Sequence, residues 1–157
     1  MLSKKIIVAL DSDNFDQCVN LVNLLKQDVY AFKIGYEFFL NFGLDGYKII
    51  YSICPKIFLD LKLHDIPNTV RKGLSAIFKI KPLMTTIHIS GGDIMMKAAK
   101  THKSHTKILG VSVLTSMDIK QTKKYYNQTN VSSLVKKFTK YAKVNKLDGV
   151  ICSPKEI

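Results

Sequence analysis

Apolar, β-branched runs alternate with segments of helical period along the chain. The first run, Ile6–Leu10, stops at a polar cluster, and further runs of the same kind follow at intervals. Short runs of this type predict strands, and apolar residues at positions i, i+3, i+4 and i+7 predict helices. The predicted strands are 6–10, 30–34, 57–62, 85–89, 108–114 and 149–152.

A helix is expected after each strand except the last. The polar cluster Asp11–Asn14 can cap the first helix, Pro67 stands near the start of the third, and Gly91–Asp93 opens the fourth. The segment after the fifth strand is expected to be a polar crossing before its helix. The second helix is expected to begin near Glu37. The expected apolar faces of the other helices are, in chain order, Cys18, Leu21, Val22 and Leu25 for the first; Val70, Leu74 and Ile77 for the third; Met95, Met96, Ala98 and Ala99 for the fourth; and Leu134, Phe138, Tyr141 and Ala142 for the fifth.

Strands that are continuously apolar and separated by helices indicate a parallel sheet, either doubly wound or closed into a (β/α) barrel. Polar residues stand at or after the ends of many strands, at Asp11, Lys33, Asp60, Lys62, His88 and Thr115. Barrel enzymes draw their catalytic groups from many strand ends, and no G-x-G-x-x-G follows the first strand. We therefore expect an α/β fold of the (β/α)8 TIM-barrel family, with about six βα units of an incomplete barrel in one domain, residues 1–157.

The composition fits a globular protein with an apolar core and a basic surface. Apolar residues make up 46% of the chain, no run has the length of a membrane span, and the net charge is +12. Arg71 is the only arginine and the lysines are dispersed, so no nucleic-acid partner is expected. Cys18, Cys54 and Cys152 lack C-x-x-C spacing and are expected to be reduced residues of a cytoplasmic protein with no membrane association.

The stretch from Asp60 to Thr69 carries the densest candidate chemistry. Residues i and i+2 of a strand project to one face, so Asp60 and Lys62 are expected to point together into the barrel mouth, with Asp65 just beyond the strand end. Alternatively, Asp60 and Lys62 form an ion pair that only closes the end of the barrel and has no catalytic role. Lys33 is also expected at this end, so more charged groups converge there than one such ion pair needs, which favours a functional site with perturbed pKa values.

The histidines are weaker candidates. His64 follows the strand and is equally well explained as a packed loop residue or a functional one. His88 alternates with apolar neighbours, which favours a hydrogen-bonded core residue over a catalyst. No carboxylate and histidine cluster has the spacing of metal ligands, so no metal is expected.

The motif Asp60-Leu61-Lys62-Leu63-His64-Asp65-Ile66-Pro67-Asn68-Thr69 resembles the signature of the orotidine 5′-phosphate decarboxylase family. Further resemblances follow in the family's order, at Val8–Asp11, Phe32–Gly35, His88–Gly92, Val113–Met117 and Leu147–Ser153. The D-x-K-x-x-D core is shared with sugar-phosphate relatives, the ketogulonate-phosphate decarboxylases and hexulose-phosphate synthases. The extension from His64 to Thr69 points to the orotidylate enzymes.

The resemblance implies a role for each matching residue. Lys62 would donate a proton to C6 of the pyrimidine as carbon dioxide leaves, and Asp60 would lie against the departing carboxylate. Lys33 and Asp11 would hold ribose hydroxyls, Lys33 would also pair with Asp60, and Thr115 would lie near the pyrimidine ring. Asp65, Ile66 and Thr69 would reach into the partner subunit of a homodimer. Orotidine 5′-phosphate is the implied substrate, and no cofactor is implied.

The family pattern continues for two βα units beyond the sixth strand, and these units carry the phosphate-gripping amides and arginine. The chain is therefore expected to be the N-terminal three quarters of such a barrel. Four alternatives stay open at this point. The chain is a decarboxylase converting orotidine 5′-monophosphate to UMP and CO2 in pyrimidine biosynthesis, a non-catalytic remnant of that enzyme, a sugar-phosphate decarboxylase relative, or a basic binding protein that reuses the fold.

Overall fold

The computed structural model describes residues 5–156, which fall into two compact units. Unit 1 comprises the chain up to Leu61 together with Ile80–Thr85, and unit 2 comprises Lys62–Lys79 together with the chain from Thr86 onward. The chain passes between the units three times, twice inside strands, between Leu61 and Lys62 and between Thr85 and Thr86, and once at the end of a helix, between Lys79 and Ile80. The expectation of one domain over residues 1–157 stays a prediction.

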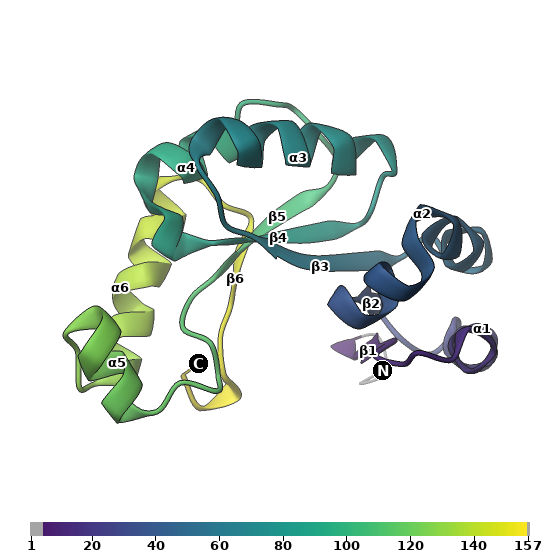
Figure 1. Ribbon diagram of the computed structural model, residues 1–157, viewed down its shortest axis with the longest axis horizontal. Helices are drawn as coiled ribbons and strands as arrows, with labels where there is room; N and C mark the ends of the chain where they lie inside the picture. Colours follow the sequence, from purple (N-terminus) through teal and green to yellow (C-terminus); the bar gives the residue numbers. More distant parts are fainter. Residues whose placement is uncertain (1–4, 157) are drawn as a thin grey trace. The chain divides into compact units, whose positions relative to one another are not determined.

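Strands and helices alternate as the pattern predicts (Figure 1). The strand order is β1-β2-β3-β4-β5-β6, and the pairs β1–β2, β2–β3 and β5–β6 are parallel. A doubly wound sheet reverses its strand order at a switch point, whereas a barrel keeps chain order, so the α/β fold class of the (β/α)8 barrel family is confirmed. The strands are β1 Ile7–Ala9, β2 Ala31–Ile34, β3 Ile57–Leu63, β4 Met84–His88, β5 Lys107–Val111 and β6 Gly149–Ile151.

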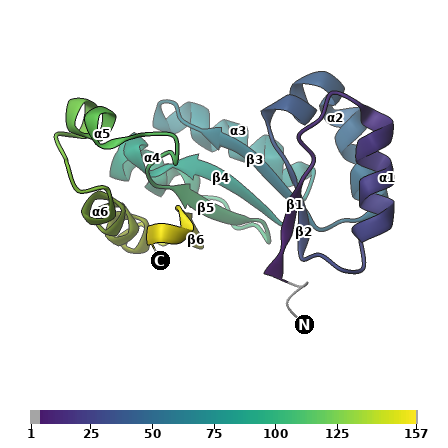
Figure 2. The same cartoon turned by 90° about the horizontal axis from the view of Figure 1, so that it is seen from below.

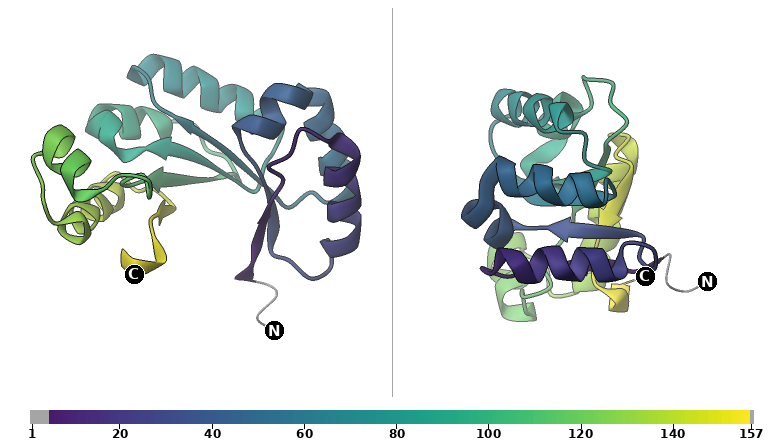
Figure 3. Two further views of the ribbon diagram at one scale, coloured as in Figure 1. Left: turned by 60° about the horizontal axis from the view of Figure 1, so that its bottom comes forward. Right: turned by 90° about the vertical axis from the view of Figure 1, so that its right-hand side faces the viewer.

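Unit 1 packs the helices α1, Phe15–Leu25, and α2, Tyr36–Ile53, side by side (Figures 2 and 3). Asn14 caps α1 by accepting from the Gln17 N–H at 3.0 Å, as the polar cluster predicts. The ring of Phe42 lies 5.1 Å from that of Phe15, centroid to centroid, and ties the two helices together. Cys18 and Val22 of the predicted apolar face are buried.

Helix α2 is interrupted at Gly43, where φ is 57° and ψ is −152°. Only glycine adopts this backbone region without strain, because a Cβ atom would clash with the backbone. Apart from the chain neighbours of Gly43 and the backbone of its own helix, a Cβ atom built there meets no atom within 4 Å. The backbone conformation, and not a lack of space, therefore requires glycine here.

Unit 2 packs α3, Pro67–Lys79, against α4, Gly92–Ala99 (Figure 1). Val70, Leu74 and Ile77 are the buried residues of α3, and Met95 and Met96 are fully buried in α4, so these predicted apolar faces are confirmed. The last long helix, α6 Val131–Val144, is joined to α4 through Asn145, whose side-chain amide donates to Asp93 Oδ1 at 2.7 Å. Short 3-10 helices follow β4 at Ile89–Gly91 and β6 at Pro154–Glu156.

The segment expected to be a polar crossing contains a helix, α5 Ile119–Tyr126. Asp118 caps it by accepting from the Gln121 N–H at 2.8 Å, and Thr122 is its one buried residue. A helix that buries a single threonine has no apolar repeat for the sequence pattern to detect. The fifth strand is also shorter than predicted, since it ends at Val111. The next residue still bonds to β6, because the Ser112 N–H donates to the Ile151 carbonyl at 3.1 Å.

Across residues 5–156, no helix combines the length and the apolar character that crossing a membrane requires.

Candidate functional site

Asp11 and Lys33 form an ion pair in unit 1. Lys33 lies on β2 beside Ala9 of β1, and Asp11 follows β1 by two residues. The Lys33 ammonium lies 3.0 Å and 3.3 Å from the two carboxylate oxygens of Asp11. The Lys33 side chain is 24% exposed and that of Asp11 is 51% exposed, so the pair is open to solvent on one side. These two predicted site residues are brought together as neighbouring parallel strands require.

Gly35 leaves room for this pair. A Cβ atom at Gly35 would lie 3.2 Å from the Lys33 ammonium and 3.4 Å from Asp11 Oδ1. The first distance is tighter than ordinary van der Waals contact and the second is at its lower limit, so a side chain at this position would press on the Lys33 ammonium.

Asp60 lies in the buried part of β3. Its exposed fraction is 7%, and the preceding residues Phe58 and Leu59 pair with Lys33 and Ile34 of β2. A carboxylate this well buried needs a polar or charged partner. The pairing of Lys33 with Asp60 that the family resemblance implies stays a prediction.

Lys62 is half-buried and has an unusual backbone. Its φ is 44°, in the left-handed region, although it lies within strand β3. This conformation costs a non-glycine residue roughly 1–3 kcal/mol and persists only where the surroundings hold it. The simple alternation of strand side chains does not apply through such a residue, so the common face of Asp60 and Lys62 stays a prediction.

The backbone of Lys62 is held by a side chain that the sequence did not single out. The Lys62 N–H donates to Thr86 Oγ1 at 2.9 Å, and Thr86 is fully buried on β4. In the sequence, Thr86 is one of several β-branched residues in an apolar strand, so nothing marks it as a functional residue.

Asp65, Ile66 and Thr69 lie where β3 leads into α3, and all three are exposed. Asp65 Oδ1 accepts from the Ile66 N–H at 2.6 Å, which orders the turn. The Ile66 side chain is 67% exposed. The assignment of these three residues to the site of a partner subunit stays a prediction.

The two candidate histidines stack on each other. The rings of His64 and His88 lie 5.0 Å apart, centroid to centroid, at an interplanar angle of 29°. His64 is exposed and His88 is half-buried. This stacking contact does not distinguish a functional role from a packing role for either histidine.

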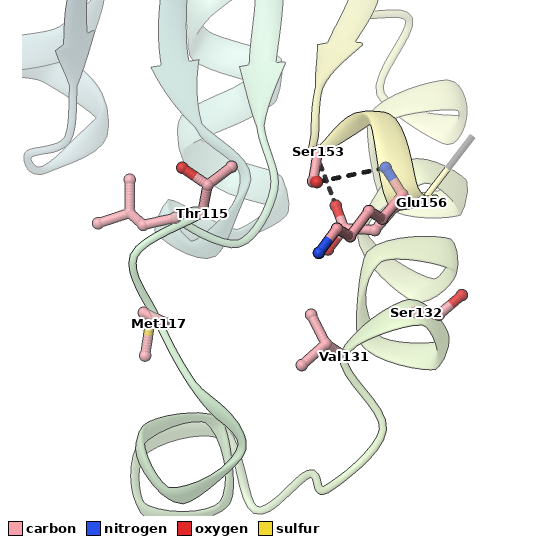
Figure 4. A pocket seen from close by; sticks show the side chains of 8 residues that line it. Thr115, Met117, Val131, Ser132, Ser153 and Glu156 are labelled. Atoms are coloured by element: carbon pink, nitrogen blue, oxygen red, sulfur yellow. Dashed lines mark hydrogen bonds between the residues drawn. The ribbon is translucent and has the colours of Figure 1, made fainter.

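Thr115 lines a cavity of about 370 Å³ in unit 2 (Figure 4). Three segments meet there, namely the loop after β5, the first turn of α6 and the 3-10 helix after β6. Lys155 contributes a cation, and Glu156 Oε2 accepts from the Ser153 N–H at 2.8 Å. The hydroxyls, the cation and the apolar walls together can hold a polar organic molecule. Ser153 and Lys155 were missed as site candidates because no charge pattern marks them.

The cysteines are free thiols, and the structure gives them no role in binding. Burial, followed by the nearby charges of Glu37 and Asp11, raises the pKa of Cys18, and burial raises the pKa of Cys152. Within the described part of the chain, no three His, Cys, Asp or Glu side chains group closely enough to bind a metal ion.

The predicted site residues therefore fall in two sets. Asp11, Lys33 and Asp60 belong to unit 1, and Lys62, Asp65, Ile66, Thr69 and Thr115 belong to unit 2. The two sets are joined covalently within β3, where only Leu61 separates Asp60 from Lys62.

Nearly the whole sequence, residues 4–157, matches the family described as "Orotidine 5'-phosphate decarboxylase / HUMPS family". The chain belongs to this family. Among family members, the orotidine 5′-phosphate decarboxylase of Ehrlichia chaffeensis is 41% identical over 155 residues, which cover 98% of this chain and 67% of the relative. That of Buchnera aphidicola is 38% identical over 156 residues, which cover 97% of this chain and 66% of the relative. The chain spans about two thirds of the length of these curated relatives.

Solved structures of family members have the same fold. The crystal structure of orotidine 5′-phosphate decarboxylase from Lactobacillus acidophilus matches with a TM-score of 0.85 and 40% identity, over 98% of this chain and 73% of that one. The orotidine 5′-monophosphate decarboxylase from Methanocaldococcus jannaschii, complexed with the inhibitor BMP, matches with a TM-score of 0.78 over 98% of this chain and 71% of that one. At 24% identity, the second match supports the fold alone.

Proposed function

We propose that this chain is an orotidine 5′-phosphate decarboxylase, a carboxy-lyase that converts orotidine 5′-monophosphate to UMP and CO2 in pyrimidine biosynthesis. The observation that carries the proposal is the match to enzymes of that name at about 40% identity across almost the whole chain. The ion pair of Asp11 with Lys33 and the constrained backbone of Lys62 support it from the structure.

In the proposed reaction, the bond between C6 of the pyrimidine and its carboxylate breaks. CO2 leaves, and the electron pair of the bond remains on C6. The Lys62 ammonium donates the proton that forms the new C6–H bond, while Asp60 lies against the departing carboxylate. A fixed cation stabilises the developing carbanion and supplies its proton, so the reaction needs no metal or organic cofactor.

The remaining candidates bind the substrate in this proposal. Asp11 and Lys33 hold the ribose hydroxyls, because an ion pair open to solvent on one side can accept from and donate to hydroxyl groups. Thr115 lies near the pyrimidine ring, which the cavity beside its side chain supports.

Asp65, Ile66 and Thr69 complete the site of a partner subunit, which makes the working enzyme a homodimer in the cytoplasm. The exposure of Ile66 supports this assembly. We also propose that residues 1–157 fold as one domain, since two of the three passages between the units lie inside the strands β3 and β4.

The activity test follows the loss of orotidylate absorbance with the purified chain. Wild type is expected to turn over, Lys62→Ala to lose turnover, and Lys72→Ala, an exposed lysine of α3, to behave as wild type. Turnover no faster than that of Lys62→Ala would contradict the proposal and favour a non-catalytic remnant. CO2 release from a keto-hexonate phosphate in place of orotidylate would favour the sugar-phosphate relatives instead.

Mixing two inactive variants tests the shared site. In a symmetric dimer with shared sites, equal amounts of Lys62→Ala and Asp65→Ala subunits regain about a quarter of wild-type activity, because half of the dimers are mixed and each has one intact site. Absence of any recovery on mixing, with both variants shown to exchange subunits, would contradict the shared site.

A further inference from the structure

Two adjacent threonines on β4 have identical burial and different hydrogen bonding. Thr85 and Thr86 are both 0% exposed. Thr86 Oγ1 accepts the Lys62 N–H at 2.9 Å, whereas Thr85 Oγ1 has no hydrogen-bond partner within residues 5–156. Thr86 thus provides a hydroxyl that is bonded to the Lys62 backbone, whereas the hydroxyl of its neighbour Thr85 makes no hydrogen bond within the described residues.

A fully buried hydroxyl is unfavourable unless it is hydrogen-bonded, and valine has nearly the same shape without this cost. The bond to Lys62 therefore explains why threonine is suitable at position 86. It also addresses the strain at Lys62, since a left-handed backbone at a non-glycine residue persists only where its surroundings hold it.

The position of the Lys62 backbone decides where its ammonium can reach. The lysine side chain is long and flexible, so its geometry is fixed mainly by the atom from which it starts and by the partners at its end. A hydrogen bond to the backbone N–H fixes the start of the side chain without occupying the ammonium.

We propose that Thr86 is a positioning residue for the proton-transfer step, which it serves by holding the left-handed backbone of Lys62 through its hydroxyl. This inference rests on the proposed decarboxylase function. Thr86 itself touches no reacting atom, and it acts only through Lys62. The hydroxyl is the required group, so serine is expected to replace threonine and valine is not.

The test compares Thr86→Val, Thr86→Ser and the matched control Thr85→Val in the orotidylate assay on the full chain. Thr86→Val is expected to lower kcat by about tenfold to a hundredfold, the range in which small misplacements of a catalytic group fall. KM is expected to stay within about threefold, because the substrate contacts made before proton transfer are unchanged. Thr86→Ser and Thr85→Val are expected to keep wild-type kcat, and thermal unfolding reports whether each variant is folded.

Wild-type kcat in Thr86→Val, or an equal loss in Thr85→Val, would overturn the positioning role while leaving the decarboxylase function intact. An inactive wild type would overturn both. If Thr86→Val fails to fold, Thr86→Ala and Thr86→Ser replace it. Loss of kcat in alanine with retention in serine supports the role, and equal kcat in the two variants overturns it.

Discussion

The hydroxyl of Tyr36 donates to the carbonyl oxygen of Leu61 at 2.6 Å. Tyr36 is the first residue of α2, and Leu61 immediately precedes Lys62 on β3. The peptide group that enters Lys62 is therefore held by side chains at both of its polar atoms, with Tyr36 at the carbonyl oxygen and Thr86 at the N–H. Both hydrogen bonds act on the residue that we propose as the proton donor.

Replacing Tyr36 by phenylalanine is expected to lower kcat for orotidylate by up to about tenfold. The change removes one hydrogen bond, whose usual contribution is about 1 kcal/mol, and each 1.4 kcal/mol corresponds to about tenfold in rate. Steady-state kinetics measure the effect. Tyr125→Phe is the control, since Tyr125 is 66% exposed on α5, and a similar fall in that variant would argue against a specific role for Tyr36.

Gly35→Ala is expected to raise KM by about twofold to fivefold. The added methyl group would press on the Lys33 ammonium and so disturb its ion pair with Asp11, and a partly exposed ion pair of this kind contributes about 0.2–1 kcal/mol. The kcat value should change less than KM, because the proposed role of the pair is to bind ribose. An unchanged KM in a folded variant would speak against that role.

Gly73→Ala provides the matched control for the added methyl group. Gly73 lies inside α3, and a Cβ atom there would lie 3.6 Å from Leu63 Cδ1, which is ordinary contact. Alanine in a helix interior is more stable than glycine by about 0.5–1 kcal/mol, so the melting temperature is expected to rise. Its KM for orotidylate should equal that of wild type.

Tyr47→Phe is expected to destabilise the fold by about 1 kcal/mol, since the fully buried Tyr47 hydroxyl donates to the Ile80 carbonyl at 3.0 Å. Burial, with a smaller effect of Tyr51, raises the pKa of Tyr47 above its usual value of 10.0. The unfolded chain then loses this proton at lower pH than the folded chain, so stability that is complete below pH 10 falls as the pH rises further. Urea unfolding at increasing pH should show a weaker alkaline loss in Tyr47→Phe, and an equal loss in both proteins would contradict the assignment.

Leu74→Ala is expected to cost about 2–5 kcal/mol of unfolding free energy, because Leu74 is 0% exposed in α3 and its loss leaves a cavity. Leu40→Ala is the matched control. Leu40 is 80% exposed on α2, so its loss should change stability by no more than about 0.5 kcal/mol. Chemical denaturation measures both, and similar values for the two variants would contradict the assigned core.

The apolar pattern was enough to predict the strands and most helices, because each core-facing helix repeats its buried residues at helical spacing. Val70, Leu74 and Ile77 of α3 were all assigned to the buried face and all are buried. Helix α5 was missed since its one buried residue is a threonine and its start depends on the cap at Asp118. Caps and short polar helices carry little periodic signal.

The site was predictable where it follows from strand ends and not where it depends on backbone conformation. Asp11 and Lys33 were both expected at strand ends and they form an ion pair, whereas the pairing of Lys33 with Asp60 stays a prediction. The left-handed backbone of Lys62 has no local signature, because lysine is not a residue that favours positive φ. The role of Thr86 depends on that conformation, so no pattern of residue types could reveal it.

The interruption of α2 at Gly43 separates two contacts that the helix makes, one on each side of the break. Its first residue, Tyr36, holds the peptide carbonyl before Lys62, while Tyr47, beyond the break, anchors the helix in the core through the Ile80 carbonyl. An unbroken helix would transmit any displacement of its core end rigidly to Tyr36. With the axis interrupted, small adjustments of packing around Tyr47 during evolution need not disturb the geometry at Leu61.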